Sequence, residues 1–311
     1  IVDYAKAGTS PVSPNKKIFY AIAIFMAMAF CIVIITIKES FTSKVLYRKE
    51  IETLTSIPVI GEVAFTKIKT PIVVEAGKRS FIAEEFRKLR TSLSFLGIDS
   101  SHKKILVTSS ISGEGKSFIA SNLAVSMSLT GKKVVLVDLD LNVPSLSKVF
   151  GIEQKFGTTQ FLKGQNKAEE IISPVGGYDN LFFIPAGSLP DNPSELIVNG
   201  KVKELIEYLQ NRFDLVIIDT SPVVLVTDGY ILSGLCDATL YVIKHNYTPK
   251  LLIKRIDENN QINELINPAI VFNGVKERGF ISNNYGYGYN YVYGKKVYGS
   301  DQNGKAKKKI I

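Results

Sequence analysis

The chain has 311 residues, enough for two domains or for one large domain with extensions. Its 2 cysteines and 2 histidines exclude a disulfide-stapled scaffold and a histidine-rich metal site. The formal charge of +9 indicates an acidic partner, for which nucleic acid, anionic lipid and nucleotide phosphate all qualify. Because the chain begins with Ile1 rather than with a methionine, we expect it to be a fragment or a processed chain.

An uncharged apolar run near the start predicts a membrane span. The run covers residues 18–37 and reads IFYAIAIFMAMAFCIVIITI. As a helix it rises about 30 Å, which is the thickness of the hydrocarbon core of a bilayer. A cleaved signal peptide fits poorly, because the run is too long and no small-residue cleavage site follows it. A buried core helix also fits poorly, since the run has no polar face.

From about Phe81 onward, apolar runs alternate with helical stretches. The pattern predicts a helix at residues 117–131 and strands at residues 103–109, 133–140, 180–187, 213–219, 238–244 and 268–274. Continuous Val, Ile and Leu runs indicate strands that are buried on both faces. The alternation predicts an α/β fold in which helices wrap a mainly parallel sheet.

The junction of the first of these strands with its helix reads SSISGEGKSF, which is typical of a P-loop. Its glycines let backbone amides close around phosphate oxygens, Lys116 would reach the β and γ phosphates, and Ser117 would hold Mg²⁺. Ser110 replaces the first glycine of the usual pattern, and a chance GEGKS in a loop is the alternative interpretation. ATP and Mg²⁺ are the expected cofactors. The expected nucleotide-binding residues of the loop are Ser112, Gly113, Glu114, Gly115, Lys116, Ser117 and Phe118.

Aspartates end two of the other predicted strands. Asp138 and Asp140 end the run VVLVDLD, and Asp219 ends LVIID. Because the carboxyl ends of parallel strands converge on one edge, we expect these carboxylates beside the P-loop. Asp219 is then a Walker B residue near the metal, and the other two hold metal-bound water or accept a proton. Helix capping is the alternative for any one of them.

The motifs GEGKS, VVLVDLD and LVIIDTSP, together with a terminal tyrosine cluster, make the chain resemble the bacterial tyrosine kinases (BY-kinases). More closely it resembles their membrane-embedded form, which is fused to a polysaccharide co-polymerase, as in Wzc-type exopolysaccharide biosynthesis proteins. The resemblance implies a tyrosine autokinase of the bacterial inner membrane that regulates polymerisation and export of exopolysaccharide or capsule. The implied partners are the polysaccharide machinery, membrane lipid, a protein-tyrosine phosphatase and further copies of the chain, but no nucleic acid.

This resemblance also implies a layout for the chain and missing segments upstream, namely a first transmembrane helix and a periplasmic domain. The expected order is an extracytoplasmic, proline-containing segment (residues 1–17), a transmembrane helix (18–37), a cytoplasmic linker (38–80), a P-loop kinase domain (81–282) and a Tyr/Gly-rich tail (283–311).

Roles for single residues follow from the same resemblance. Asp138 is expected to accept the tyrosine proton, while Asp140 and Asp219 hold the metal with Ser117. Asn142 stands where the family motif D-x-D-x-R has arginine, which would weaken catalysis. Asn273 is expected to meet the adenine, although an asparagine before a glycine is more often part of a turn. The segment EEFRKLR supplies the E-x-x-R-x-x-R spacing that the family uses to form rings, with Glu84, Arg87 and Arg90.

The tail reads NNYGYGYNYVYGKKVYG from residue 283, and it offers phenols rather than core residues. The glycine and asparagine spacers would keep it mobile, so that a tyrosine can enter an active site. The alternative is a low-complexity tail for adhesion or self-association. The expected phosphoacceptors are Tyr285, Tyr287, Tyr289, Tyr291, Tyr293 and Tyr298.

Two other functions remain open at this point. One is a MinD/ParA-like ATPase that switches membrane or DNA association. Such proteins carry a lysine two residues before the position of Gly113, where this chain has Ile111, and they lack a tyrosine tail. The other is a non-catalytic scaffold that binds ATP in a polysaccharide assembly, which the asparagine at position 142 leaves possible.

Overall fold

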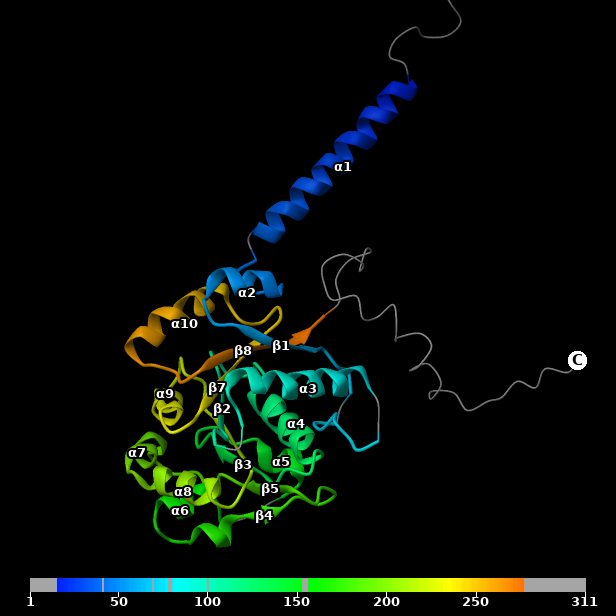
Figure 1. Ribbon diagram of the computed structural model, residues 1–311. Coiled ribbons are helices and arrows are strands. Elements are labelled where there is room, and N and C mark those ends of the chain that lie inside the picture. The colour runs from blue at the N-terminus through cyan, green and yellow to red at the C-terminus, as the bar shows by residue number, and fades with distance from the viewer. Residues whose placement is uncertain are drawn as a thin grey trace, which may run out of the picture. The chain divides into compact units, whose positions relative to one another are not determined.

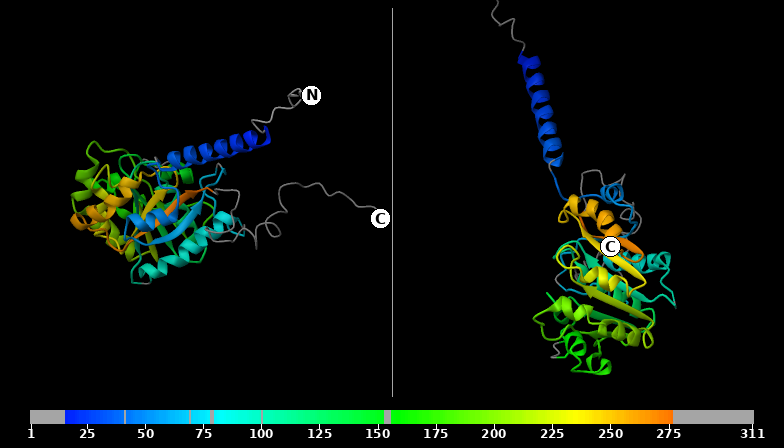
Figure 2. Two further views of the ribbon diagram at one scale, coloured as in Figure 1. Left: turned by 90° about the horizontal axis from the view of Figure 1, so that it is seen from above. Right: turned by 90° about the vertical axis from the view of Figure 1, so that its left-hand side faces the viewer.

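Two compact units make up the chain, Ile1–Ser43 and Lys44–Ile311 (Figures 1 and 2). The computed structural model describes residues 16–40, 42–68, 70–77, 80–99, 101–152 and 156–276. The predicted tail, with all of the expected phosphoacceptor tyrosines, lies outside these described residues, and so does most of the predicted segment at residues 1–17.

The first unit contains a long apolar helix, α1 (Lys16–Ser40). Its side chains are exposed along Lys16–Ile37. Within the described part of the chain, it is the one helix that is long and apolar enough to cross a membrane. The helix predicted at residues 18–37 is therefore present, and its length and composition suit a bilayer.

An eight-stranded sheet forms the centre of the second unit, in the order β1-β8-β7-β2-β6-β3-β5-β4. Neighbouring strands are parallel, except that β4 is antiparallel to β5. Each predicted strand has a counterpart in this sheet. The strands are β1 (Val59–Ala64), β2 (Lys104–Ser109), β3 (Val134–Leu139), β4 (Ser173–Pro174), β5 (Leu181–Ile184), β6 (Leu215–Thr220), β7 (Ala238–Lys244) and β8 (Pro268–Val275).

Helices cover both faces of the sheet (Figures 1 and 2). The helices are α2 (Arg48–Leu54), α3 (Phe81–Ser92), α4 (Lys116–Ser128), α5 (Leu146–Phe150), α6 (Thr158–Leu162), α7 (Pro193–Val198), α8 (Lys201–Gln210), α9 (Asp228–Ser233) and α10 (Lys250–Ile262), with short 3-10 turns η1 (Leu93–Leu96) and η2 (Ala168–Ile171). Alternate residues of a strand face opposite sides. Ile105 and Val107 of β2 therefore pack with α3 and α4, whereas Leu106 packs with α8 and α9. On that second face, α2 and α10 cover β7 and β8.

The structure corrects the predicted linker at residues 38–80. Because the second unit begins at Lys44, this stretch contributes α2 and the edge strand β1 to the folded unit. β1 pairs in parallel with β8, and Ile51 of α2 is fully buried. The sequence pattern does not predict β1, because Gly61 interrupts its apolar run. A Cβ at Gly61 would lie 2.9 Å from Cδ1 of Leu89 on α3, so a larger residue here would have to displace the Leu89 side chain.

The order of the strands brings the predicted site together. β6 lies between β2 and β3, so the ends of these three parallel strands are neighbours. Asp138 of β3 is directly opposite Asp219 of β6, and Val107 of β2 is opposite Asp219 on its other side. The carboxyl edge of the sheet therefore carries the candidate site, as expected for an open parallel sheet.

Glu85 of α3 generates a prediction about stability and pH. Its carboxylate accepts a hydrogen bond of 2.7 Å from the Ala64 amide of β1. Burial raises the pKa of Glu85 from 4.5 to about 7, and Glu62 adds to the rise. The folded state therefore binds this proton more tightly than the unfolded state does. The resulting stability is fully present below about pH 4.5 and is lost as pH rises through about 7.

Glu85→Gln keeps the hydrogen-bond acceptor but does not titrate. We expect the variant to lose part of the decline in Tm between pH 4.5 and 7, and to gain about 2–5 °C near neutral pH. Thermal melts followed by circular dichroism at several pH values measure this. Glu258→Gln, which changes an exposed glutamate of α10, should keep the wild-type profile. A wild-type slope in Glu85→Gln would contradict the prediction.

Candidate active site

The loop between β2 and α4 has the backbone of a phosphate cradle. Residues 110–115 follow β2, and α4 begins at Lys116. Gly113 and Gly115 have φ values of 86° and 101°, in the left-handed region that favours glycine. A Cβ at Gly115 would lie 2.2 Å from Nδ2 of Asn273, so a side chain there would collide with β8. The amides of this loop and of the first helical turn form an anion-binding end of α4.

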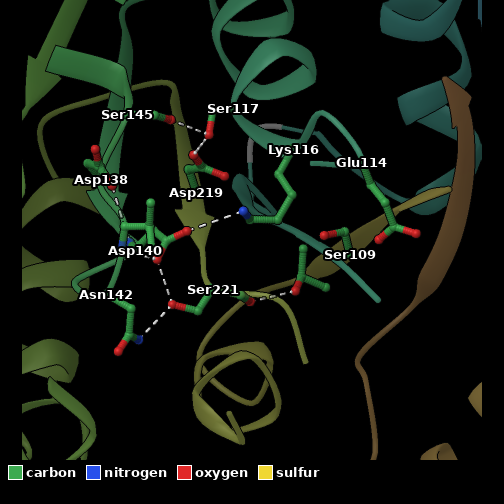
Figure 3. Close-up of polar contacts among 12 residues, drawn as sticks. Ser109, Glu114, Lys116, Ser117, Asp138, Asp140, Asn142, Ser145, Asp219 and Ser221 are labelled. Atoms are coloured by element: carbon green, nitrogen blue, oxygen red, sulfur yellow. Dashed lines mark hydrogen bonds and ion pairs between the residues drawn. The ribbon is translucent and has the colours of Figure 1, made fainter. Parts of the chain in front are cut away.

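Lys116 is held inside the site by a carboxylate (Figure 3). Its Nζ lies 3.2 Å from Oδ2 of Asp140, and both side chains are buried. The other oxygen of Asp140 accepts a hydrogen bond of 2.7 Å from the Ser221 hydroxyl. Asp140 therefore holds the end of the lysine side chain close to the loop.

Ser117 and Asp219 form the second contact of the site (Figure 3). The Ser117 hydroxyl donates to Oδ2 of Asp219 at 2.5 Å and accepts from the Ser145 hydroxyl at 2.8 Å. Burial raises the pKa of Asp219 to about 6, against the lowering effect of Lys116. Oδ1 of Asp219 is buried and has no hydrogen-bond partner among the described residues. An unsatisfied carboxylate oxygen beside a hydroxyl suits a bound cation.

Asp138 lies opposite Asp219 on the neighbouring strand. It is fully buried and accepts hydrogen bonds from the amides of Asp140 and Leu146, at 3.2 and 3.4 Å. Burial, together with the charges of Asp219 and Asp140, raises the pKa of Asp138 well above its ordinary value. A carboxyl group with a raised proton affinity is suited to accepting a proton from a reacting hydroxyl.

The predicted metal ligands fit Mg²⁺ that arrives with a nucleotide. Among the described residues, no three His, Cys, Asp or Glu side chains form a group that would hold a metal by themselves. Mg²⁺ commonly takes one or two protein oxygens and completes its shell with water and phosphate. Ser117 and Asp219 supply such oxygens. Asp140 binds Lys116 and Ser221 in this structure, so its place on the metal stays a prediction.

Two predicted nucleotide contacts are engaged elsewhere. The side-chain amide of Asn273 donates to the Glu114 carbonyl at 2.8 Å, so it supports the loop, and its role at the adenine stays a prediction. The ring of Phe118 packs edge to face with Phe86 at 5.8 Å between ring centres. The Phe118 ring thus contacts α3, and its role at a nucleotide stays a prediction.

The remaining loop residues are held from outside. The carbonyl of Ser112 accepts a hydrogen bond of 2.9 Å from the Tyr247 hydroxyl. The carboxylate of Glu114 turns away from the cradle and accepts from the Thr248 hydroxyl and from the Ile111 amide. Glu114 therefore shapes the loop, and its side chain is not placed to touch phosphate.

The predicted self-association residues lie on α3, which is not part of this edge. Glu84 forms an ion pair with Arg87 one turn along the same helix. The guanidinium of Arg90 donates to the Ser126 carbonyl of α4 at 2.9 Å. Arg90 is therefore committed to an internal contact, and the role of the three residues in a ring stays a prediction.

Sequence reasoning missed a short polar chain behind Asp140. The Asn142 side-chain amide donates to Oγ of Ser221 at 3.0 Å, and that hydroxyl donates to Asp140 (Figure 3). Asn142 thus takes part in the site although it lacks the charge of arginine. Ser145 was missed in the same way. The available signal was a serine within a few residues of each strand end that carries the aspartates, Ser221 directly after β6 and Ser145 six residues after β3.

This geometry defines a P-loop nucleotide-binding domain, and comparisons with known proteins agree. A family model described as ParA, NUBPL iron-transfer P-loop NTPase, matches residues 100–225. The solved BceF tyrosine kinase domain has a TM-score of 0.67 and 28% identity to this chain, and the match covers 75% of this chain and 100% of that domain. The predicted fold class is therefore confirmed.

Proteins with similar sequences identify the family to which this P-loop domain belongs. Tyrosine-protein kinase YwqD of Bacillus subtilis is 32% identical over 185 residues, which cover 60% of this chain and 78% of YwqD. The chain therefore belongs to the family of bacterial tyrosine-protein kinases. EpsB of Ralstonia nicotianae is 30% identical over 313 residues, which cover 96% of this chain. The chain spans only 41% of the length of EpsB.

The cradle geometry predicts the effect of a side chain at Gly115. Gly115→Ala would place a methyl group 2.2 Å from Nδ2 of Asn273, at a φ of 101°. Relieving this contact must displace either the loop or the Asn273 amide that holds the Glu114 carbonyl, so we expect nucleotide binding to weaken by at least about 10-fold. Titration of a fluorescent ADP analogue measures the loss.

A matched control is Gly131→Ala, just beyond α4. Gly131 has a φ of 87°, but a Cβ there would meet nothing within 4 Å. The control shares the backbone strain and lacks the collision, so it should keep the wild-type affinity. Equal affinities for all three proteins would show that the loop tolerates a side chain and would contradict the prediction.

Proposed function

We propose that the chain is a membrane-anchored tyrosine autokinase that transfers the γ-phosphate of ATP to the tyrosines of its C-terminal tail. The observation that carries the proposal is the contact of Ser117 with the buried Asp219, beside Asp138 and the P-loop Lys116. This arrangement supplies a cation site and a proton acceptor at one strand edge. Membership of the bacterial tyrosine-kinase family supports tyrosine as the acceptor.

The proposed reaction depends mainly on positioning and charge. Ser117 and Asp219 would hold Mg²⁺, which would reduce the charge that repels the incoming hydroxyl. Lys116 lies 3.2 Å from Asp140 and would turn its ammonium toward the β and γ phosphates. The tyrosine oxygen bonds to the γ-phosphorus as the bond to the bridging oxygen breaks and ADP leaves. Asp138 accepts the phenol proton.

We further propose that α1 anchors the protein in the bacterial inner membrane with the second unit in the cytoplasm. The length and apolar composition of α1 support the anchor, and the cytoplasm supplies ATP. The resemblance to membrane-embedded co-polymerases supports a role in regulating the polymerisation and export of exopolysaccharide or capsule. A protein-tyrosine phosphatase would then reverse the modification.

The ParA family match supports a second candidate, an ATPase without a tyrosine substrate, because that match covers the P-loop and Asp219. A third candidate is the nucleotide-binding scaffold, which the loss of the motif arginine supports. In this structure, however, Asn142 still connects through Ser221 to Asp140, so the position keeps a contact with the site. One labelling experiment separates the three functions.

Lys116→Met tests the kinase proposal. Because Lys116 supplies the charge that meets the phosphates, we expect tyrosine labelling from radioactive ATP to fall by at least about 100-fold. The matched control is Lys203→Met, which removes an exposed lysine of α8 and should label like wild type. Release of free phosphate without labelled tyrosine in the wild-type chain would point to the ATPase, and neither product would point to the scaffold.

The half-buried ion pair on α3 tests the proposed ring. Glu84→Ala with Arg87→Ala removes a helix pair worth only a few tenths of a kcal/mol to the fold, and it leaves Arg90 on Ser126. If the pair contacts a neighbouring copy, sedimentation should shift from oligomer toward monomer while Tm changes little.

The control for this experiment is an exposed ion pair on α8, Lys203 with Glu207. Replacing both of its residues by alanine should leave sedimentation unchanged. An oligomer that survives the α3 substitutions would remove the ring from the proposal without affecting the kinase chemistry.

A further inference from the structure

Three consecutive carbonyls of the P-loop accept hydrogen bonds from side chains outside it. Ser112 accepts from Tyr247 at 2.9 Å and Gly113 accepts from Nζ of Lys244 at 2.8 Å. The third carbonyl, that of Glu114, accepts from the side chain of Asn273 at 2.8 Å. The donors lie at the end of β7, in the loop that follows it and on β8.

These outward bonds fix the direction of the amides. In a planar trans peptide, the carbonyl and the following N–H point to opposite sides. Drawing these carbonyls outward therefore turns the amides of Gly113, Glu114 and Gly115 toward the cradle. None of these amides donates a hydrogen bond within the described part of the chain. Successive amides that point into one hollow form an anion-binding nest.

Thr248 contacts the same loop through the side chain of Glu114. Its hydroxyl donates to the Glu114 carboxylate and accepts from the Lys244 amide at 2.9 Å. Thr248 and Glu114 are both fully buried, and Glu114 forms no ion pair among the described residues. The second oxygen of Glu114 accepts from the Ile111 amide at 2.8 Å, so the carboxylate connects the start of the loop to Thr248.

Burial raises the pKa of Glu114 to about 7, with the Thr248 hydroxyl opposing the rise. A buried carboxylate without a counter-ion depends on each of its donors. Loss of the Thr248 hydroxyl would remove the bond that ties this side chain to the β7–α10 connection. The loop would then gain conformations that do not match phosphate.

We propose that Lys244, Tyr247 and Thr248 are positioning residues that hold the P-loop in its phosphate-binding shape before a nucleotide arrives. Nζ of Lys244 lies 4.9 Å above the Tyr247 ring, which keeps the two outer donors together. The proposal deepens the proposed function but rests only on nucleotide binding, whatever the phosphate acceptor is. The benefit is preorganisation, since the ordering of the loop is complete before binding.

Thr248→Val tests the inner contact, because it keeps the shape of the side chain and removes the hydroxyl. We expect the Kd for ADP with Mg²⁺, measured by calorimetry on the full chain in detergent, to rise by about 10-fold. Thr248→Ser restores the hydroxyl and should return the Kd to within about twofold of wild type. In the kinase assay, the KM for ATP should rise more than kcat falls.

Thr239→Val is the matched control. Like Thr248, Thr239 is buried, and its hydroxyl shares a hydrogen bond of 2.8 Å with Ser233. Thr239 lies on β7, at the end of the strand that is opposite to the P-loop. Loss of the Thr239 hydroxyl should lower Tm about as much as Thr248→Val does and should leave the Kd for ADP unchanged. An equal weakening in both valine variants would mean that general destabilisation explains the effect, and it would overturn the proposal.

If Thr248→Val does not fold, Tyr247→Phe tests the proposed positioning role instead. Tyr247 is 37% exposed, so loss of the hydroxyl should leave Tm unchanged, while the Kd for ADP rises by about threefold. Wild-type affinity in this variant would overturn the proposal. A wild-type chain that binds ADP but never labels tyrosine would refute the kinase function and leave this inference intact.

Discussion

Buried carboxylates facing each other across two parallel strands are the constraint on which the rest of the structure depends. Asp138 and Asp219 are paired in register and fully buried, so like charges meet where water is excluded. Burying two carboxylates together raises the free energy of the folded state unless a cation or a proton compensates their charge. Lys116 supplies one positive charge through Asp140, and burial beside Asp219 and Asp140 raises the pKa of Asp138. The P-loop must therefore lie next to these strands, which explains the position of β2 beside β6.

The parts of the fold that could be predicted are those written as long periodic runs. Strands such as β6 and β7 are continuous apolar sequences, and the glycines of the P-loop indicate a left-handed backbone at their own positions. β1 was missed because it is short, contains Gly61 and is stabilised by β8 and α3, which are distant in sequence. No local pattern reports such a pairing, since its energy comes from tertiary contact.

The same distinction holds within the site. Aspartates at strand ends could be found because parallel topology fixes where they meet. The side chains that orient them could not, because a serine after a strand is common and its partner is set by the fold. Asn142 illustrates the limit: the sequence shows a missing arginine, whereas the structure shows an amide bonded through Ser221 to Asp140. For Asn273, the sequence suggested a ligand contact and the structure places it on the Glu114 carbonyl.

The pairing of β1 with β8 also sets the order in which the protein can fold during synthesis. Val59 is the register partner of Ile270, so the two strands that close this edge are separated by about 200 residues. The second unit can complete its sheet only after β8 has been made, because α2 packs with β8 and α10 and β1 pairs with β8. A chaperone that shields this unfinished edge would act late in translation.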